Sequence, residues 1–183
     1  MPKVVAEKRD WIKLGFELFA NHGEAGIIVD KMVAKLKCNR SSFYWHFKSK
    51  KGFIREIVDY WMDFDTEAII ALTEKSQSPK VKLKSLVATV FHKDPQMDFV
   101  FYLKRYAQKD DTIRDLIDQV DQRRMKYVSD IFQELGYSKK DAELKASIFY
   151  KYLIGYHEMI RYRNQPKDYV KIVFDELTHF IKI

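Results

Sequence analysis

The chain has 183 residues, of which 46% are hydrophobic and 32% are charged, and it carries a formal net charge of +7. This composition is typical of a folded domain and excludes an intrinsically disordered tail. No apolar run comes near the roughly 20 residues that span a bilayer, and the N-terminal residues are charged where a signal peptide is apolar, so we expect no membrane partner.

Glycine, proline and cysteine are scarce. Six Gly and four Pro, together with many strong helix formers and few strand-like alternations, predict an all-α protein of about nine helices. Cys38 is the single cysteine, which excludes an internal disulfide and is typical of a reducing cytoplasm, where we expect the protein to act.

The excess positive charge lies in the first third of the chain. Residues 1–56 hold twelve Lys and Arg against six Asp and Glu, so almost all of the +7 charge is found there. A basic segment of this kind indicates a nucleic-acid partner, although a basic surface can also simply face solvent.

Three helices are expected in this basic segment. The first covers about residues 5–21 and ends before Gly23, and the second covers residues 29–36. After a tight turn, Asn39 is expected to cap a third helix that ends near Phe47, because its side chain can accept a hydrogen bond from a free backbone N–H. A longer helix followed by two short ones is helix-turn-helix geometry.

The third helix opens the stretch NRSSFYWHFKSKKGF, residues 39–53, which gathers aromatic and basic side chains. No acidic residue occurs from residue 31 to residue 55. Phe43 and Phe47 are four residues apart and are expected to face the first two helices. Arg40 is expected to face outward, where its guanidinium can donate two hydrogen bonds to guanine.

Eight residues in and directly after this helix are therefore candidates for DNA contact. They are Arg40, Ser41, Ser42, Tyr44, Trp45, His46, Lys48 and Lys50. For the three ring side chains at positions 44 to 46, the alternative is packing against the next helix.

The remaining chain is expected to hold six further helices. Ser49 is expected to cap a long helix over residues 50–74, which links the basic segment to the rest. Its apolar stripe consists of Phe53, Ile57, Trp61, Phe64, Ala68 and Leu72. The later helices are expected at residues 79–92, 95–107, 112–135 and 139–163 and after Pro166, with start signals at Ser78–Pro79, Asp94–Pro95 and Ser138 with Asp141.

The helix over residues 139–163 is apolar on two sides. One stripe consists of Ala146, Phe149, Leu153 and Ile160, and the other of Ile148, Tyr152, Gly155 and Met159. Because a helix in a small monomer needs only one buried stripe, the second stripe favours contact with another copy of the chain. The alternative is a central helix that its own chain buries on all sides.

Three segments together carry a family resemblance. They are IKLGFELF over residues 12–19, VDKMVAKL over residues 29–36 and RSSFYWHFKSK over residues 40–50. They resemble the tetracycline-repressor (TetR) family of bacterial transcription regulators, and the resemblance covers about residues 9–58. The last segment is the most specific, and in it Tyr44, His46 and Lys48 resemble the phosphate contacts of the family.

The resemblance implies an all-α homodimer with two domains. Residues 1–48 would form the helix-turn-helix DNA-binding domain, and residues 49–183 the helical effector-binding and dimerisation domain. The last two helices, about residues 141–183, would form a four-helix interface with those of a second copy. Binding of an effector would move the fourth helix and change the spacing of the two reading heads.

The sequence departs from the family pattern at three positions near the turn. Lys37 replaces the usual Gly, so the turn is either less tight or left-handed. Ile28 replaces a Ser or Thr that would cap the second helix, and Cys38 replaces an aliphatic residue.

Neither a metal nor a cofactor is expected. The five His lack the spacing of metal ligands, and the string that begins at His157–Glu158 has Arg161 where a zinc protease has its second His. Aromatic and Met side chains instead suggest a pocket for an organic ligand, with core packing as the alternative. The candidate ligand-binding residues are Phe91, Met97, Tyr102, Tyr106, Met125, Phe149, Tyr152 and Tyr156.

The sequence therefore predicts a ligand-responsive transcription regulator, acting as a repressor. Its expected partners are a pseudo-palindromic double-stranded DNA operator, a second copy of itself and an unknown small-molecule effector that releases it, and we expect it at the bacterial nucleoid. One alternative is a small-molecule-binding or interaction protein of the same fold without specific DNA binding. Another is an all-α enzyme, which the absence of an acid–base or metal motif disfavours.

Overall fold

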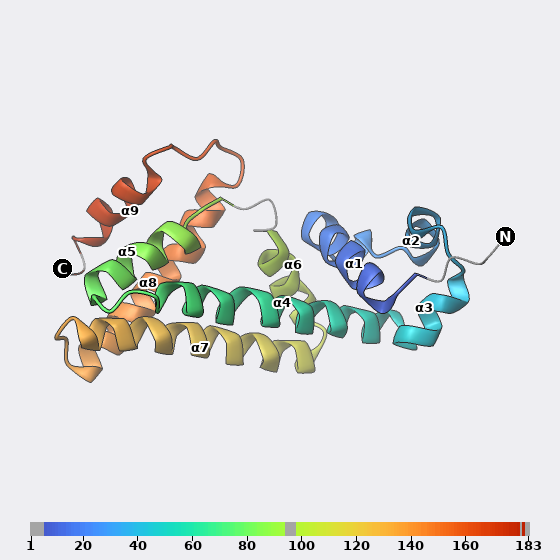
Figure 1. The fold of residues 1–183 in the computed structure, drawn as a ribbon, viewed down its shortest axis with the longest axis horizontal. Coiled ribbons are helices and arrows are strands. Elements are labelled where there is room, and N and C mark those ends of the chain that lie inside the picture. Colours follow the sequence, from blue (N-terminus) through green and yellow to red (C-terminus); the bar gives the residue numbers. More distant parts are fainter. Residues whose placement is uncertain (1–5, 94–97, 180, 182–183) are drawn as a thin grey trace. The chain divides into compact units, whose positions relative to one another are not determined.

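The computed structural model describes residues 6–93, 98–179 and 181, and only the backbone of residues 63–65. All regular structure in these residues is helical, which confirms the predicted all-α class (Figure 1). The elements in chain order are α1 (Lys8–His22), the 3₁₀ turn η1 (Gly23–Gly26), α2 (Val29–Leu36), α3 (Arg40–Phe47), α4 (Lys50–Thr73), α5 (Pro79–Val90), α6 (Asp98–Ala107), α7 (Asp111–Glu134), α8 (Lys139–Ile160) and α9 (Tyr169–Leu177).

The turn between α2 and α3 is left-handed. Lys37 has φ 50° and ψ 40°, which is one of the two alternatives left open by the absence of glycine. For a residue with a Cβ atom this conformation costs about 1–2 kcal/mol. Ile28 precedes α2 without a side-chain cap, as its apolar side chain requires.

Of the predicted side-chain caps, those of Ser49 and Ser138 form hydrogen bonds, whereas Asn39 and Ser78 precede their helices without one. Ser49 Oγ accepts a hydrogen bond of 3.0 Å from the Gly52 N–H, and Ser138 Oγ accepts one of 3.2 Å from the Asp141 N–H. Asn39 does precede α3, but its side chain makes no capping hydrogen bond. The start signal at Asp94–Pro95 lies outside the described residues.

The chain divides into two compact units. Unit 1 comprises residues 1–64 and 95–117, and unit 2 comprises residues 65–94 and 118–183. The two long helices α4 and α7 therefore each begin in unit 1 and end in unit 2. The domain boundary predicted between residues 48 and 49 divides a DNA-binding domain from an effector-binding and dimerisation domain, and it stays a prediction.

The core of unit 1 is largely aromatic. Phe43 of α3 packs on Trp11 of α1, with 5.3 Å between ring centres, and on Phe53 of α4 at 5.0 Å. On α6, Phe99 packs on Phe19 of α1 at 5.2 Å and on Trp61 of α4 at 5.6 Å. Late segments of the chain thus complete the packing of the first helices.

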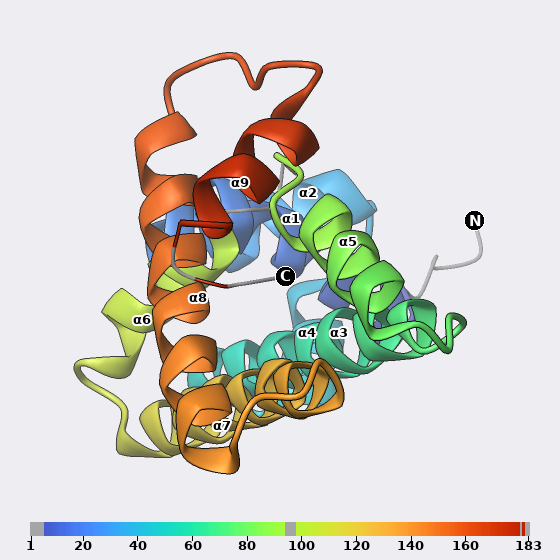
Figure 2. The ribbon, with the colours of Figure 1, turned by 90° about the vertical axis from the view of Figure 1, so that its left-hand side faces the viewer.

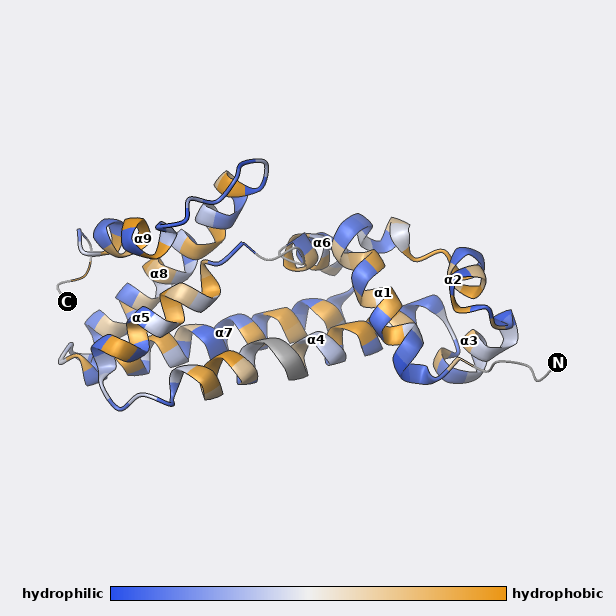
Figure 3. Ribbon diagram, turned by 45° about the horizontal axis from the view of Figure 1, so that its top comes forward, coloured by the Kyte–Doolittle hydropathy of each residue, from blue (hydrophilic) through white to orange (hydrophobic). Residues whose placement is uncertain are grey.

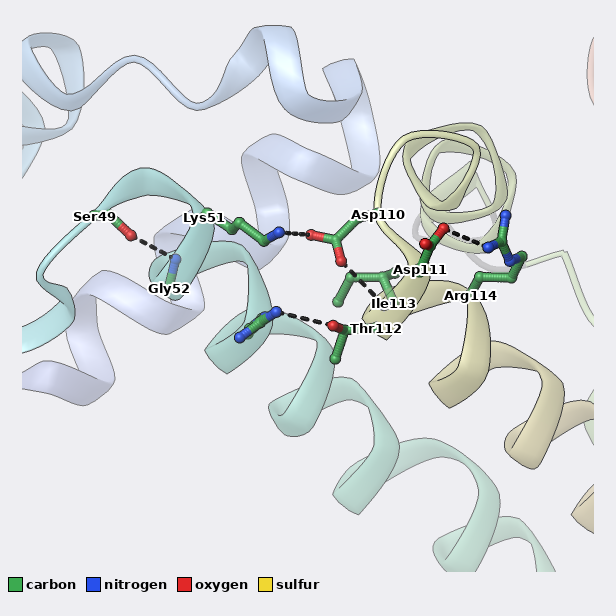
Figure 4. A network of polar contacts seen from close by, with 9 residues as sticks. Ser49, Lys51, Gly52, Asp110, Asp111, Thr112, Ile113 and Arg114 are labelled. Atoms are coloured by element: carbon green, nitrogen blue, oxygen red, sulfur yellow. Dashed lines mark hydrogen bonds and ion pairs between the residues drawn. The ribbon is translucent and has the colours of Figure 1, made fainter.

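A polar network attaches the start of α7 to the start of α4 within unit 1 (Figure 4). The Lys51 ammonium lies 3.0 Å from the buried carboxylate of Asp110, and Arg55 donates a hydrogen bond of 3.0 Å to the Thr112 hydroxyl. Burial raises the pKa of Asp110, but Lys51, the Ile113 N–H and Arg55 together outweigh burial and hold that pKa below its usual value. The first turns of α4, directly after α3, are therefore fixed by charged contacts.

Unit 2 is built around one apolar core to which α5, α7, α8 and α9 all contribute (Figure 2). Its buried members include Leu86, Phe91, Phe132, Phe149 and Leu177. Most helices show a hydrophobic side and a hydrophilic side, as Figure 3 shows for α4 and α7. This pattern is the physical basis of the sequence prediction.

The predicted apolar stripe of α4 is correct only in its first half. Phe53, Ile57 and Trp61 are buried. Further along, Leu72 and Ala68 are exposed, which corrects the prediction, and the side chain of Phe64 lies outside the described residues. The buried positions there are Thr66 and Thr73, on another side of the helix, because that half packs within unit 2.

Candidate nucleic-acid interface

Helix α3 presents one apolar and one polar side. Phe43 and Phe47 are buried, as predicted, and both rings pack on Phe53 in the first turn of α4. These contacts hold α3 at the surface of unit 1 by a single face. On the opposite face, Ser41, Tyr44 and Trp45 are exposed among the residues that the structure describes.

The outward face carries unusually large aromatic surfaces. Trp45 is 73% exposed and Tyr44 is 41% exposed. Burial against α4, the alternative for these two rings, is therefore not what the structure shows. Large exposed aromatic side chains next to basic ones are typical of a binding surface.

The remaining candidates for DNA contact differ in exposure. Arg40, Ser41 and Lys48 are exposed, whereas Ser42, His46 and Lys50 are half-buried. The Ser42 hydroxyl oxygen is buried and has no hydrogen-bond partner among the described residues. His46 Nε2 lies 3.3 Å from the carbonyl oxygen of Ala6. No DNA is present, so contact by any of the eight residues stays a prediction.

The end of α3 is a tight turn. Lys48 has φ 61°, in the left-handed region that a side chain disfavours. Its backbone N–H still donates to the carbonyl oxygen of Tyr44, at 3.1 Å. After this strained turn, α4 begins only three residues beyond the end of α3.

One residue of this surface escaped the sequence analysis. Asp30, in the first turn of α2, lies with Oδ1 3.2 Å from the NH1 nitrogen of Arg40. The NH2 nitrogen of Arg40 donates to the Tyr44 hydroxyl at 3.4 Å, and this bond and then the Asp30 charge raise the pKa of Arg40. Asp30 stands one residue before the acid-free stretch, and no local pattern connects it with Arg40.

The predicted ligand-binding residues fall into two groups. In unit 2, the Phe91 ring lies 5.6 Å from that of Phe149, 5.4 Å from that of Tyr152 and 5.1 Å from that of Tyr156. Met125 of α7, also in unit 2, is half-buried. These contacts form an aromatic cluster around Phe91, and its role in binding stays a prediction.

The other predicted ligand-binding residues lie elsewhere. Tyr102 and Tyr106 belong to α6 in unit 1, where the Tyr106 ring lies 6.4 Å from that of Phe19. A Cβ atom added to Gly23 would come within 2.6 Å of the Tyr102 ring, so that ring packs directly on the turn after α1. Met97 lies outside the described residues.

A groove of about 500 Å³ lies at α5 and α9. None of the residues around it belongs to the predicted ligand-binding set. They are Lys84, Asp168, Val170, Lys171 and Phe174.

The described part of the chain shows neither a membrane-spanning helix nor a metal-binding cluster. No helix there has the length and apolar character that a membrane span requires. No group of three or more His, Cys, Asp or Glu side chains is arranged there to hold a metal ion.

Comparison with solved structures gives matches along almost the whole chain. A protein from Saccharomonospora viridis, described as a transcriptional regulator and solved with choline, is 15% identical with a TM-score of 0.81, and the match covers 95% of this chain and 94% of that one. A TetR-like transcriptional regulator from Rhodococcus sp. RHA1 is 13% identical with a TM-score of 0.71, with 94% and 93% covered. AibR, solved with isovaleryl coenzyme A and operator DNA, is 16% identical with a TM-score of 0.67, with 93% and 96% covered.

These matches define the fold. The chain has the all-α fold of TetR-like transcriptional regulators, which confirms the expectation from the FYWHFKSK segment at this level. No protein-family model matches the sequence, and a comparison with curated proteins gives no match.

Proposed function

We propose that the protein is a ligand-responsive transcriptional regulator, acting as a repressor, that binds operator DNA through α3. The observation that carries this proposal is the exposed face of α3 on a helix-turn-helix fold, with Trp45, Tyr44 and Arg40 outward and Phe43 and Phe47 holding the helix from behind. The fold it shares with AibR, which was solved with operator DNA, supports the same function.

The chemistry of this face suits a DNA major groove. Arg40 reads base edges, and Tyr44, His46, Lys48 and Lys50 contact phosphates on either side. Ser41 is small enough to let the helix approach the bases. Trp45 packs on sugars or thymine methyl groups. Non-specific attraction comes from the basic excess of the N-terminal third.

The proposed regulator is a homodimer that pairs through α8 and α9. Exposed apolar side chains follow one side of α8 and its end: Leu144, Ile148, Met159 and Tyr162. Gly155 lies on the same side, and no atom of the described residues lies within 4 Å of a Cβ atom added there, so the described part of the chain leaves that space open. Ile172 of α9 is also exposed. Two copies then place two reading helices on a pseudo-palindrome with half-sites about 34–36 Å apart.

The effector is proposed to bind in unit 2, at the aromatic cluster around Phe91. Neighbours of the same fold were solved with choline and with isovaleryl coenzyme A, so the fold accepts small molecules of different chemistry. Occupation of the cluster is proposed to move α4 and thereby release the operator.

DNA binding is tested by gel shift with fragments from the DNA flanking the coding sequence. Arg40→Ala and Tyr44→Ala are each expected to weaken binding about tenfold or more, because a two-bond contact to a base or a phosphate contact is lost. Rising salt is expected to weaken wild-type binding steeply, since phosphate contacts release counterions. Lys75→Ala, which removes an exposed charge in the turn after α4, serves as the control.

Equal binding by wild type and by both α3 variants would contradict this proposal. It would favour a small-molecule-binding or interaction protein of the same fold without specific DNA binding.

The dimer is tested by sedimentation of a charged variant. Met159 is 67% exposed and Ile148 is 48% exposed, so Ile148→Glu combined with Met159→Glu leaves the folded chain intact but places two charges in the proposed interface. We expect the variant to sediment as a monomer and to lose operator affinity. Glu143→Lys, an exposed change on another side of α8, is the control. A wild-type protein that sediments as a monomer would refute the dimer.

A further inference from the structure

Two neighbours fix the orientation of the first residue of the reading helix. The NH1 nitrogen of Arg40 lies 3.2 Å from Oδ1 of Asp30 and 3.4 Å from Oδ2. The NH2 nitrogen donates to the Tyr44 hydroxyl at 3.4 Å, and the guanidinium carbon lies 5.7 Å from the centre of the Tyr44 ring. The guanidinium is thus held from α2 on one side and from the next turn of α3 on the other.

Stability does not explain this arrangement. The side chains of Arg40 and Asp30 are 59% and 69% exposed, and ion pairs with that exposure contribute little to folding. A carboxylate on the face that approaches DNA also opposes binding, because it repels phosphates. The Asp30 carboxylate does, however, orient the Arg40 side chain.

We propose that Asp30 is a positioning residue that holds Arg40 for a guanine, so that each half-site of the operator carries a G·C pair at the position Arg40 reads. The inference rests on the proposed function, since α3 must lie in the major groove. Arg40 is the first residue of α3, and the N-terminal residues of a recognition helix reach base edges. A guanidinium donates two parallel hydrogen bonds to O6 and N7 of guanine, a pattern that no other base offers.

Orientation before binding increases the selectivity of this contact. An unrestrained arginine loses rotamer freedom when it reaches a base, which weakens the complex. Asp30 and Tyr44 impose that order in the free protein. Asp30 therefore has two effects on DNA binding. It strengthens binding to the correct base because it orients Arg40, and it weakens binding to unselected DNA because it repels phosphates.

The test is selection of sites from a pool of randomised DNA duplexes by the full-length protein, at one fixed salt concentration. We expect wild type to enrich pseudo-palindromic sites with a guanine at one position of each half-site, and Arg40→Ala to lose that guanine. Asp30→Asn is expected to reduce the guanine preference about tenfold while binding unselected duplex more tightly than wild type. In the Arg40→Ala background, Asp30→Asn is expected to leave base preference unchanged.

Two further variants separate positioning from charge and from folding. Glu17→Gln removes an exposed carboxylate from α1 and is expected to retain the guanine preference. Asp30→Glu keeps the negative charge that favours the first turn of α2 but moves the carboxylate by one methylene. It is expected to lower the guanine preference without tighter binding to unselected DNA.

The outcomes distinguish the inference from the proposed function. If Asp30→Asn and Asp30→Glu enrich the same guanine as strongly as wild type, Asp30 does not position Arg40, and the DNA-binding function stands. The same holds if the base that depends on Arg40 is not guanine. If wild type enriches no sequence at all, the proposed function fails and the inference with it.

Discussion

Gly15 determines how closely α1 can approach α4. A Cβ atom built at this position would lie 2.3 Å from Cζ of Phe53 and 2.7 Å from Cδ1 of Ile57. Both are far below any normal contact distance, and Phe53 also packs against Phe43 of α3. Glycine is therefore needed at position 15 so that Phe53, which packs against α3, can keep its place.

We predict that Gly15→Ala lowers the free energy of unfolding by about 1–2 kcal/mol, because overpacking outweighs the better helix propensity of alanine. Thermal or urea denaturation measures the change. Lys13→Ala, at an exposed position of the same helix, should be close to neutral. A Gly15→Ala protein at least as stable as wild type would show that Phe53 can move aside without loss.

The burial or hydrogen bonding of a single residue was predictable where it depends on residues close to it in the sequence. The burial of Phe43 and Phe47 follows from their four-residue spacing, and the hydrogen bond from Gly52 to Ser49 follows from capping chemistry. The contact between Asp30 and Arg40 was not predictable, because it depends on the angle between two helices. That angle is set by the left-handed turn at Lys37, whose exact course the sequence leaves open.

At the level of elements, a buried lysine ties three helices of unit 2 together. Lys82 of α5 is buried, and its ammonium lies 2.8 Å from Glu74, the residue directly after α4, and 3.1 Å from Glu134 of α7. The hydrogen bond from Lys82 is the main cause that holds the pKa of Glu74 below its usual value. The pair of carboxylates raises the pKa of Lys82 in turn.

We predict that Lys82→Met destabilises the protein by about 1–2 kcal/mol at neutral pH, since two partly exposed carboxylates then face each other without a cation. The carboxyl pKa is depressed in the folded state, so this stabilisation exists above the ordinary pKa of 4.5 and is lost as pH falls through the folded value. The difference in the free energy of unfolding between variant and wild type should therefore shrink below about pH 4.5.

Denaturation curves over a pH series measure this effect, with Lys84→Met on the exposed side of α5 as the control. A deficit that stays constant down to acidic pH would mean that lost packing, not charge, is responsible.

The positions of the helices in the sequence were largely predictable, whereas the side of each helix that is buried was not. The start of α8 follows from Ser138 with Asp141. For α4, the same spacing rule predicted the burial of Trp61 correctly and that of Leu72 wrongly. Periodicity identifies an apolar side only when one core covers the whole helix, and α4 contributes to two units.

At the scale of the whole molecule, unit 1 is discontinuous in sequence. Phe99 of α6 packs on Phe16 at 4.6 Å and on Phe19 at 5.2 Å, so the second segment of unit 1 fills the core of the first. The ion pair between Lys51 and Asp110 belongs to the same assembly. No pattern in residues 1–56 predicts the contacts with Phe99 and Asp110, which lie far along the chain.

A fragment of residues 1–62 is therefore predicted to lack a stable core. It exposes the rings of Phe16, Phe19 and Trp61 that Phe99 covers in the complete chain. We expect a weak near-ultraviolet circular dichroism spectrum and no cooperative melting, in contrast to the full-length protein. A fragment that melts cooperatively would show that the first helices suffice.

The discontinuity also has a consequence for synthesis. Helix α3 leaves the ribosome early, but unit 1 is complete only after residue 117 has been made. Translation proceeds at about 5–20 residues per second, so unit 1 of the nascent chain stays incomplete for several seconds. A product that terminates early, at any codon before α6, thus lacks the second segment of unit 1 and the side chains with which that segment fills the core.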